Sequence, residues 1–264
     1  MILYDQHVHS YYSFDSDQKI EEYLVEAKRL RLSYFVLTDH CDLNYLDKRN
    51  DLFFSLKKQN EELNKLQKDF KEIKLLRGIE IGYKPNQIER IKKILETHTF
   101  DLVNFSLHEA DGIDYYYPEE FKKRGIEKTL NHYFNKLLEA VESFNDYDVL
   151  CHFDYGFKTA YLSDNTFNIG DYKDDITKIM KVVIQNNKAL EINIKVQSFL
   201  PLEHTKYILN LYRSLGGTYL TLSSDAHKLC NFRHNFEKYI KLIKECGFDS
   251  LTYFVNREKY LLKI

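Results

Sequence analysis

Short apolar runs alternate with amphipathic stretches along most of this chain. In the first amphipathic stretch, Ile20, Tyr23, Leu24, Ala27 and Leu30 recur at the spacing of one helix face, which predicts a helix. Helices predicted in this way cover residues 20–31, 53–70, 87–96, 127–144, 172–186, 202–215 and 232–245. Apolar runs of strand length cover residues 2–8, 33–37, 74–80, 101–108, 147–152, 189–194 and 219–223, and a further short apolar segment lies at 251–255.

This alternation predicts an α/β fold, because a crossover helix must carry the chain back before the next parallel strand can form. The predicted strands are nearly all apolar, so we expect both of their faces to be buried. Seven strand–helix units of this kind favour a closed barrel over an open sheet. No Gly/Ser-rich linker interrupts the sequence, and we expect residues 1–264 to form one domain.

Composition argues against several classes of function. The 38 basic and 40 acidic residues nearly balance and the pI is about 6.6, which argues against a nucleic-acid partner. No apolar run approaches the roughly 18 residues of a membrane span, and the N-terminal segment lacks the apolar core of a signal peptide. Cys41, Cys151, Cys230 and Cys246 form no CxxC pair, which suits a reducing compartment. We therefore expect a cytoplasmic protein without a membrane partner.

Histidines gather at the ends of the predicted strands. His7 and His9 lie two apart at the end of the first strand, so their side chains point the same way. Glu80 and Asp225 occupy the same kind of position on later strands. The C-terminal ends of barrel strands meet at one rim, so these groups should converge there, as metal ligands do. The strand-end histidines are His7, His9, His40, His108, His152 and His227, whereas His98, His132, His204 and His234 fall on predicted helices or loops and are expected to be solvated or capping residues.

The residues at these strand ends form short motifs. The motifs are His7-x-His9-Ser10 with Ser13-x-Asp15, Thr38-Asp39-His40, Gly78-Ile79-Glu80-Ile81-Gly82, Ser106-Leu107-His108, His152-x-Asp154 and Ser224-Asp225-x-His227. They resemble the PHP (polymerase and histidinol phosphatase) family, and more narrowly its stand-alone histidinol-phosphate phosphatases. The resemblance covers nearly the whole chain, with the motifs in order. It implies a distorted (β/α)7 TIM-like barrel with the active site at the C-terminal ends of the strands and two to three divalent metal ions bound there.

The resemblance also implies how the ligands are shared. One metal ion would take His7, His9, Glu80 and Asp225. A second would share Glu80 as a bridge and take His108 and His152, and a third would take Asp15, His40 and His227. Mixed imidazole and carboxylate ligands suit zinc, iron or manganese, without distinguishing among them. Asp5, Asp39 and Asp154 neighbour the ligands and either orient imidazoles or cap strand ends, while Cys41 and Cys230 are expected to be small buried residues.

The implied charges favour an anionic substrate. Three divalent ions, three carboxylate ligands and a bridging hydroxide would leave a net charge of roughly +2, which matches a phosphate monoester dianion. In the resembled family a metal-bridging hydroxide attacks phosphorus. Glu80, Asp225 and His227 are the catalytic positions that this implies around the hydroxide.

Phosphate-anchoring side chains and a lid are further candidates. The resembled phosphatases carry basic residues after strands five and six, and Lys158 and Lys195 stand there in this chain. The resemblance implies arginine at both places, and lysine keeps the charge of arginine but loses its bidentate geometry. An insertion at residues 109–125 carries Tyr115, Tyr116 and Tyr117, which would form either a lid over the rim or part of the core.

The predicted activity is hydrolysis of L-histidinol phosphate to L-histidinol and phosphate, in histidine biosynthesis, by a monomer or small homo-oligomer. A PHP-family phosphatase for another monoester, such as a sugar phosphate or phosphotyrosine, would share the same metal site. A non-catalytic metal-binding scaffold is the alternative from another class, but such scaffolds usually lose ligands and all nine positions are filled here. No GxSxG elbow and no glycine-rich nucleotide loop occurs in the sequence.

Overall fold

The computed structural model describes residues 4–164 and 167–264, and its centre is a mostly parallel sheet. The strands follow the order β10-β9-β8-β5-β4, and both β1 and β2 then pair with β4. Every pairing in this sheet is parallel except that of β3 with β2. The strands are β1 (Tyr34–Leu37), β2 (His40–Asp42), β3 (Leu52–Phe53), β4 (Lys74–Gly82), β5 (Leu102–Ser106), β8 (Val149–Leu150), β9 (Ala189–Asn193) and β10 (Leu220–Ser223).

The N-terminal segment joins the two ends of this sheet without forming a full strand. Val8 makes an isolated parallel bridge with Ala226, beyond β10. The Thr38 amide, just beyond β1, donates to the Val8 carbonyl at 2.9 Å. The expected strand at 2–8 is therefore wrong over residues 4–7, and residues 1–3 lie outside the described chain. Here a side chain replaces a backbone carbonyl of a neighbouring strand as the acceptor, since the Val8 amide donates to Thr38 Oγ1 at 3.0 Å. The TIM-like fold is distorted at this point, because the backbone hydrogen bonds between strands do not run continuously around the barrel.

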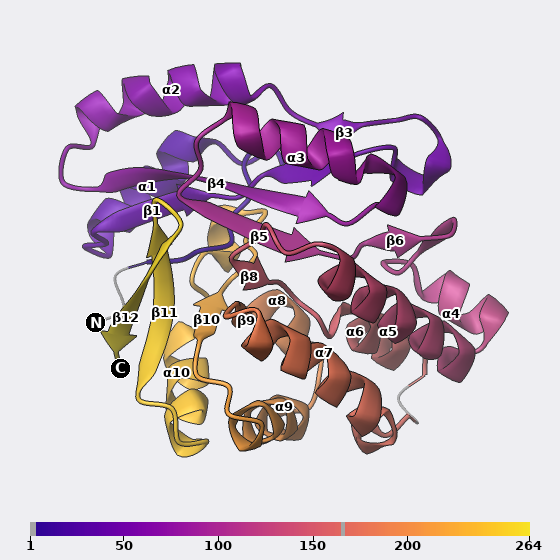
Figure 1. Ribbon diagram of the computed structural model, residues 1–264. Coiled ribbons are helices and arrows are strands. Elements are labelled where there is room, and N and C mark those ends of the chain that lie inside the picture. The colour runs from indigo at the N-terminus through magenta and orange to yellow at the C-terminus, as the bar shows by residue number, and fades with distance from the viewer. Residues whose placement is uncertain (1–3, 165–166) are drawn as a thin grey trace.

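Helices surround the sheet much as the sequence predicts (Figure 1). The largest boundary difference is at the last helix, which begins at Phe236 instead of residue 232, because a 3-10 turn over Leu229–Asn231 and a left-handed Asn235 (φ 61°) precede it. The helix predicted to begin at residue 53 begins at Leu56, after β3 and the Ser55 cap. Among the described residues no helix is long and apolar enough to cross a membrane. The predicted helices are α1 (Ile20–Arg29), α2 (Leu56–Asp69), α3 (Ile88–Thr97), α5 (Ile126–Ser143), α7 (Lys173–Gln185), α9 (Leu202–Ser214) and α10 (Phe236–Glu245).

Two helices at the rim were not predicted. Helix α6 (Tyr155–Ser163) follows β8, and α8 (Ile194–Gln197) follows β9. The first six residues of α6 are all buried, so no apolar stripe at helical spacing reveals it. The short helix α8 is capped by the Asn193 side chain, which accepts from the Val196 amide at 3.1 Å.

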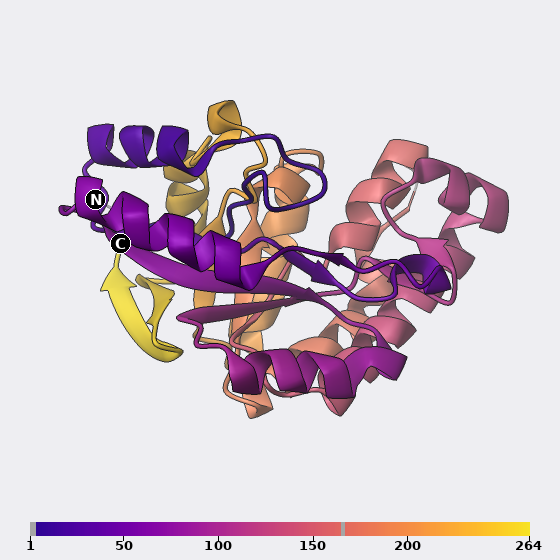
Figure 2. The same ribbon diagram turned by 90° about the horizontal axis from the view of Figure 1, so that it is seen from above.

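The insertion after β5 folds into a small hairpin and a helix. Strands β6 (Glu109–Ala110) and β7 (Ile113–Asp114) pair antiparallel, and α4 (Pro118–Arg124) follows them. In both views these elements lie at one end of the molecule, towards which β4 and β5 point (Figures 1 and 2).

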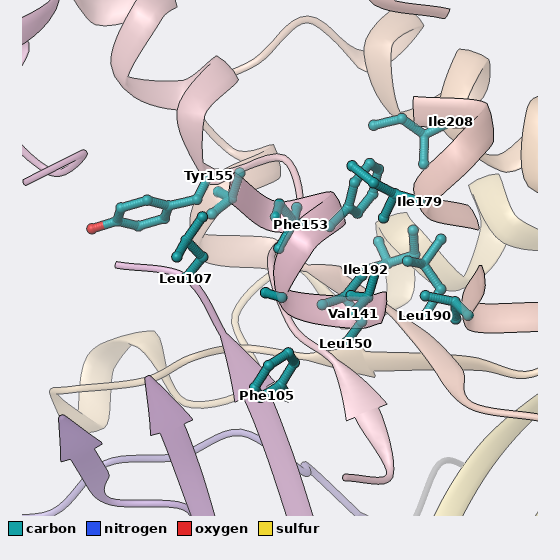
Figure 3. Packing of buried hydrophobic residues seen from close by; sticks show 14 of the residues in the cluster. Phe105, Leu107, Val141, Leu150, Phe153, Tyr155, Ile179, Leu190, Ile192 and Ile208 are labelled. Carbon is teal, nitrogen blue, oxygen red and sulfur yellow. The ribbon is translucent and has the colours of Figure 1, made fainter. Parts of the chain in front are cut away.

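Apolar side chains from the strands meet those of the surrounding helices in the main core. Figure 3 shows Leu190 and Ile192 of β9 close to Val141 of α5 and Ile179 of α7. All four side chains are completely or almost completely buried. Each buried side chain of this size contributes about 1.5–3 kcal/mol relative to an exposed one, so the helix–sheet contact holds the strands in place.

The opposite end of the sheet is covered by a C-terminal hairpin of β11 (Ser250–Val255) and β12 (Glu258–Lys263). Its turn residues Asn256 and Arg257 have φ of 51° and 62°, as a type I′ turn requires. The Asn256 amide donates to Asp101 Oδ1 at 3.0 Å, and Arg257 Nε donates to Asp148 Oδ2 at 3.0 Å. Asp101 and Asp148 precede β5 and β8, so the hairpin lies against the N-terminal ends of the strands, away from the rim.

Gly78 on β4 allows β1 to approach closely, and its replacement tests this packing. A Cβ at Gly78 would lie 2.5 Å from the Leu37 carbonyl oxygen, so Gly78→Ala must shift backbone and should lower the free energy of unfolding by about 1–3 kcal/mol. Urea unfolding measures the change. In the control Gly170→Ala the nearest atom is the Asn168 side-chain oxygen at 3.3 Å, and a change of only about 0.5 kcal/mol is expected. Equal losses in the two variants would contradict this account.

Candidate metal centre

Glu80 lies at the centre of the predicted ligands. Its carboxylate is fully buried at the end of β4. His152 Nε2 lies 2.8 Å from Glu80 Oε1, and His40 Nδ1 lies 3.0 Å from Oε2. His7, His9 and His108 reach the same carboxylate at 3.2, 3.4 and 3.2 Å. Five imidazoles from separate parts of the rim therefore surround one carboxylate.

Asp225 and Asp15 contact His227, the remaining histidine among the predicted ligands. Asp225 Oδ1 lies 3.3 Å from His9 Nε2 and 3.3 Å from His227 Nδ1. Asp15 Oδ2 lies 2.9 Å from His227 Nε2, and Asp15 Oδ1 lies 3.6 Å from His40 Nε2. The structure thus brings all nine predicted ligand residues into one cluster.

The donor atoms form overlapping groups within which all atoms lie less than 4.8 Å apart. These groups cross the three predicted ligand sets. His40, for example, was expected with Asp15 and His227 but also groups with Glu80 and His108. The groups are His7–His9–Glu80, His40–Glu80–His108, His9–His40–His227 and His7–His152–Asp225.

The buried atoms of this cluster fit metal ions. Within the described chain His7 Nε2, His9 Nε2, His40 Nδ1, His227 Nε2 and Glu80 Oε2 are buried and form no hydrogen bond. Nearly all buried polar side-chain atoms in folded proteins have a partner. Imidazole nitrogens and carboxylate oxygens are the usual ligands of zinc, iron and manganese, so metal ions would supply the partner that these atoms lack.

Electrostatics keep the carboxylates ionised. Burial alone would raise the pKa of Glu80, but His7, His40 and His108 around it hold that pKa well below its usual value. Burial, together with His227 and His40, lowers the pKa of His9. Burial acts in the same direction on His7, His40 and His108, but the carboxylates around these three outweigh it and raise their pKa values. Metal ions bind ionised carboxylate and neutral imidazole, so they would displace the protons of these three histidines.

Two ligand positions have strained backbones. His152 and Asp225 have φ of 25° and 51°, in the left-handed region that residues other than glycine rarely adopt. Such conformations cost about 1–3 kcal/mol each and cluster at functional sites. The strain accompanies the sharp turns by which β8 and β10 direct these side chains into the cluster.

Two carboxylates that the sequence analysis missed orient the imidazoles. Glu191 Oε1 lies 2.8 Å from His7 Nδ1, and Asp42 Oδ1 lies 2.8 Å from His108 Nδ1. With Nδ1 engaged, Nε2 faces the cluster. Each carboxylate had a sequence signal: Glu191 interrupts an apolar strand run, and Asp42 lies two residues after His40, on the same face of a strand.

Asp5, Asp39 and Asp154, for which orienting an imidazole and capping a strand end were both open, act differently from Glu191 and Asp42. Asp39 accepts from the Ser13 hydroxyl at 2.7 Å, and Ser13 Oγ in turn lies 3.0 Å from His9 Nδ1. Asp5 accepts from the amide and hydroxyl of Ser224, and Asp154 accepts from the Gln197 amide group. Neither carboxylate is paired with an imidazole in the part of the chain that the structure describes. Their role is to hold the backbone and loops of the rim.

The remaining histidines and cysteines lie outside the ligand cluster, with one exception. His98 caps α3 through the Ile94 carbonyl, and His132 contacts the Tyr115 hydroxyl at 2.7 Å. His204 is partly buried and His234 is exposed. Cys41 is buried as expected, but Cys230 is exposed, contrary to expectation. Cys151 lies beside His7 and Glu191, with ligand-type atoms less than 4.8 Å apart.

A cavity of about 350 Å³ opens onto the cluster. Lys195 of α8 lines it, with Nζ 3.3 Å from Asp225 Oδ1 and 3.1 Å from His227 Nδ1. Lys158 of α6 is buried beside it, with Nζ 4.4 Å from the Tyr155 ring centroid. Burial and the neighbouring Lys195 lower the pKa of Lys158 to about 8. Both lysines therefore lie at the cavity and not on the open surface.

The tyrosine run divides between core and cavity. Tyr115 is fully buried against Tyr133, whereas Tyr116 and Tyr117 are about half exposed and line the cavity. Tyr116 and Tyr117 therefore occupy the position expected of a lid, whereas Tyr115 belongs to the core.

Residues 5–195 match the model of the PHP domain family. The chain belongs to this family. It is 28% identical over 263 residues to a probable histidinol-phosphatase of Clostridium acetobutylicum, covering 99% of each chain. It is 28% identical to a histidinol-phosphatase of Lactococcus lactis, covering 95% of this chain and 93% of the other.

A solved structure agrees closely with the fold. The crystal structure of histidinol phosphate phosphatase from Lactococcus lactis, complexed with zinc, L-histidinol and phosphate, superposes with a TM-score of 0.84 at 27% identity. The match covers 97% of this chain and 98% of that one. The PHP fold expected from the strand-end motifs is therefore confirmed.

Replacing the central carboxylate tests the multinuclear site. We expect wild-type protein to carry about two to three transition-metal ions per chain after supplementation, because its donor groups are multiple and overlapping. Glu80→Ala should lose most of this metal and all turnover, since Glu80 contacts five imidazoles. Elemental analysis by mass spectrometry measures the content.

The matched control is His98→Ala, which removes a histidine that only caps α3. It should keep its metal. Fewer than one ion per chain in wild type, or similar losses in the two variants, would rule out the multinuclear site.

Proposed function

We propose that this protein is a metal-dependent phosphomonoesterase that hydrolyses L-histidinol phosphate to L-histidinol and phosphate. The observation that carries the proposal is the convergence of nine ligand residues on a cavity that lysine also lines. The full-length relatives named histidinol-phosphatase, and the complex of one with zinc, L-histidinol and phosphate, support this substrate.

The predicted ligand sets suit this chemistry. His7, His9, Glu80 and Asp225 would hold one ion. His108 and His152 would hold a second with Glu80 between the two, and Asp15, His40 and His227 would hold a third. Zinc, iron or manganese bound there would activate water at neutral pH and neutralise the charge on the phosphoryl oxygens.

The chain's own side chains would bind and position the ester. Lys195 and Lys158 would attract the phosphate dianion, and both approach the cavity from helices that follow the strands. Asp225 and His227 lie beside Lys195 at the cavity, so an anchored phosphate would lie against the ligand cluster. Groups fixed before the reaction need no reorganisation when charge develops.

We also infer that the protein acts in the cytoplasm, as a monomer or small homo-oligomer. Four free cysteines, three of them buried, support a reducing compartment.

Kinetics on a panel of monoesters test the proposed substrate. L-Histidinol phosphate should have a kcat/KM at least about tenfold above those of glucose 6-phosphate, phosphotyrosine and p-nitrophenyl phosphate, because specific contacts to a leaving group of this size are worth at least about 1–3 kcal/mol. Preference for a sugar phosphate or phosphotyrosine would replace the proposed substrate. No turnover of any monoester by metal-loaded protein would favour a scaffold.

The two lysines can be tested as phosphate anchors. A lost charge-assisted hydrogen bond is worth about 1.5–3 kcal/mol, so Lys158→Ala and Lys195→Ala should each lower kcat/KM about 10- to 150-fold for every monoester. Metal content should not change, and arginine should retain much of the activity. If kcat/KM falls by less than about twofold in both variants, neither lysine has a role in phosphate binding. If kcat/KM falls for one substrate alone, the substituted lysine recognises the leaving group of that substrate.

The pH profile separates Lys158 from the other groups. Because its pKa is lowered to about 8, Lys158 is charged below that pH and loses its attraction for phosphate above it. Lys158→Arg remains charged throughout. The ratio of wild-type to Lys158→Arg kcat/KM should therefore fall between pH values of about 7 and 9, and a constant ratio would contradict the role.

A further inference from the structure

The two lysines proposed to anchor the phosphate lie close together and repel each other. Lys158 is in α6 and Lys195 is in α8, and the two helices are in contact. Burial and, after it, the Lys195 ammonium lower the pKa of Lys158, so the two positive charges are near enough to interact. Like charges do not hold each other in place, and some other contact must fix the lysines beside one cavity.

The two helices differ in how firmly they are held. The first six residues of α6 are all buried, which fixes that helix. Helix α8 is only a single turn, and one turn is unstable without tertiary contacts. Its Ile194 and Val196 side chains are buried, and Asn193 caps its first amides. The C-terminal end of α8 depends on its last residue, Gln197.

Gln197 is hydrogen-bonded through both ends of its side-chain amide. Its Nε2 donates to Asp154 Oδ2, and its Oε1 accepts from the Thr205 hydroxyl at 2.7 Å. Asp154 immediately precedes α6, and Thr205 lies in α9. All three side chains are at most 1% exposed. A buried chain of carboxylate, amide and hydroxyl thus joins three helices, and its members are not among the described residues that line the cavity.

The Asp154 carboxylate is available for this link because it does not cap its own helix. An aspartate immediately before a helix usually accepts from the first-turn amides of that helix. The Asp154 side chain makes no such bond, and within the described chain Gln197 is the one side chain that donates to it. The carboxylate therefore holds α8 instead of α6.

We propose that Gln197 is a positioning residue, which ties α8 to α6 through Asp154 and so holds Lys195 at the phosphate position beside Lys158. This inference rests on the proposed phosphatase function and on Lys195 as a phosphate anchor. Gln197 itself contacts neither phosphate nor metal ligands. Loss of the link should therefore weaken the binding of every monoester by a similar factor and leave the metal cluster intact.

Replacing the amide tests this role. Gln197→Met keeps the length of the side chain and removes both hydrogen bonds. It should lower kcat/KM about 3- to 10-fold for both L-histidinol phosphate and p-nitrophenyl phosphate, as expected for about one net hydrogen bond. The inhibition constant of inorganic phosphate should rise by about the same factor, because phosphate uses the same anchor. Metal content, measured by elemental analysis, should not change.

The matched control is Gln67→Met, in α2, which carries neither lysine. Gln67 also uses both ends of its amide, since Nε2 donates to the Phe70 and Ile73 carbonyls and Oε1 accepts from the Leu75 amide at 2.9 Å. This variant should keep kcat/KM and the inhibition constant of phosphate within about twofold of wild type. Circular dichroism checks the folding of both variants.

A double-mutant comparison shows whether Gln197 acts through Lys195. In the Lys195→Ala background, Gln197→Met should change kcat/KM and the inhibition constant by less than about twofold, because the group that it positions is gone. An equal loss in both backgrounds, or no loss in either, would overturn the inference and leave the phosphatase function standing. If Lys195→Ala alone has no effect, the anchor and this inference fall together. If wild type hydrolyses no monoester, the function falls as well.

Should Gln197→Met fail to fold, Thr205→Val takes its place. It removes the hydroxyl that holds the Gln197 carbonyl and keeps the size of the side chain. Its loss of kcat/KM should exceed about twofold and should disappear in the Lys195→Ala background. A loss that is absent, or that is equal in the two backgrounds, would again overturn the inference.

Discussion

One buried carboxylate organises the functional end of this protein. Glu80 has no exposure to solvent and is surrounded by five imidazoles. Alone at that depth its charge would be strongly unfavourable. The surrounding imidazoles, and the metal ions that their unpaired nitrogens bind, stabilise the buried charge of Glu80. The fold serves this arrangement, because parallel strands bring their C-terminal ends to one rim.

The strands of the sheet and the elements that follow them have different roles. Most of the candidate ligand residues lie on strands or shortly beyond them, and buried Glu191 and Asp42 orient two of the imidazoles. The lysines proposed to anchor the phosphate lie on added elements, Lys158 on α6 and Lys195 on α8. Rigid strands suit a metal cluster, whereas loops and short helices can change without disturbing it. This division is consistent with one metal site serving different monoesters within a family.

The rim contains conformations and charges that the rest of the molecule must stabilise. His152 and Asp225 have left-handed backbones. Burial raises the pKa of Asp5 and Asp39 to about 6 and that of Asp154 to about 7. The helix–sheet core and the β11–β12 hairpin at the far end supply the compensating contacts. The contacts that stabilise the fold and the candidate metal site therefore lie at opposite ends of the same strands.

The sequence by itself determined the alternation of strands and helices and the set of candidate ligand residues. Both are local signals, because apolar periodicity and a polar residue at the end of an apolar run can be read without knowing the neighbours. The tertiary structure decided what depends on residues far apart in the chain. The first six residues of helix α6 are all buried and show no periodicity, Val8 is held by Ala226 and Thr38, and the grouping of candidate ligands crosses the expected sets.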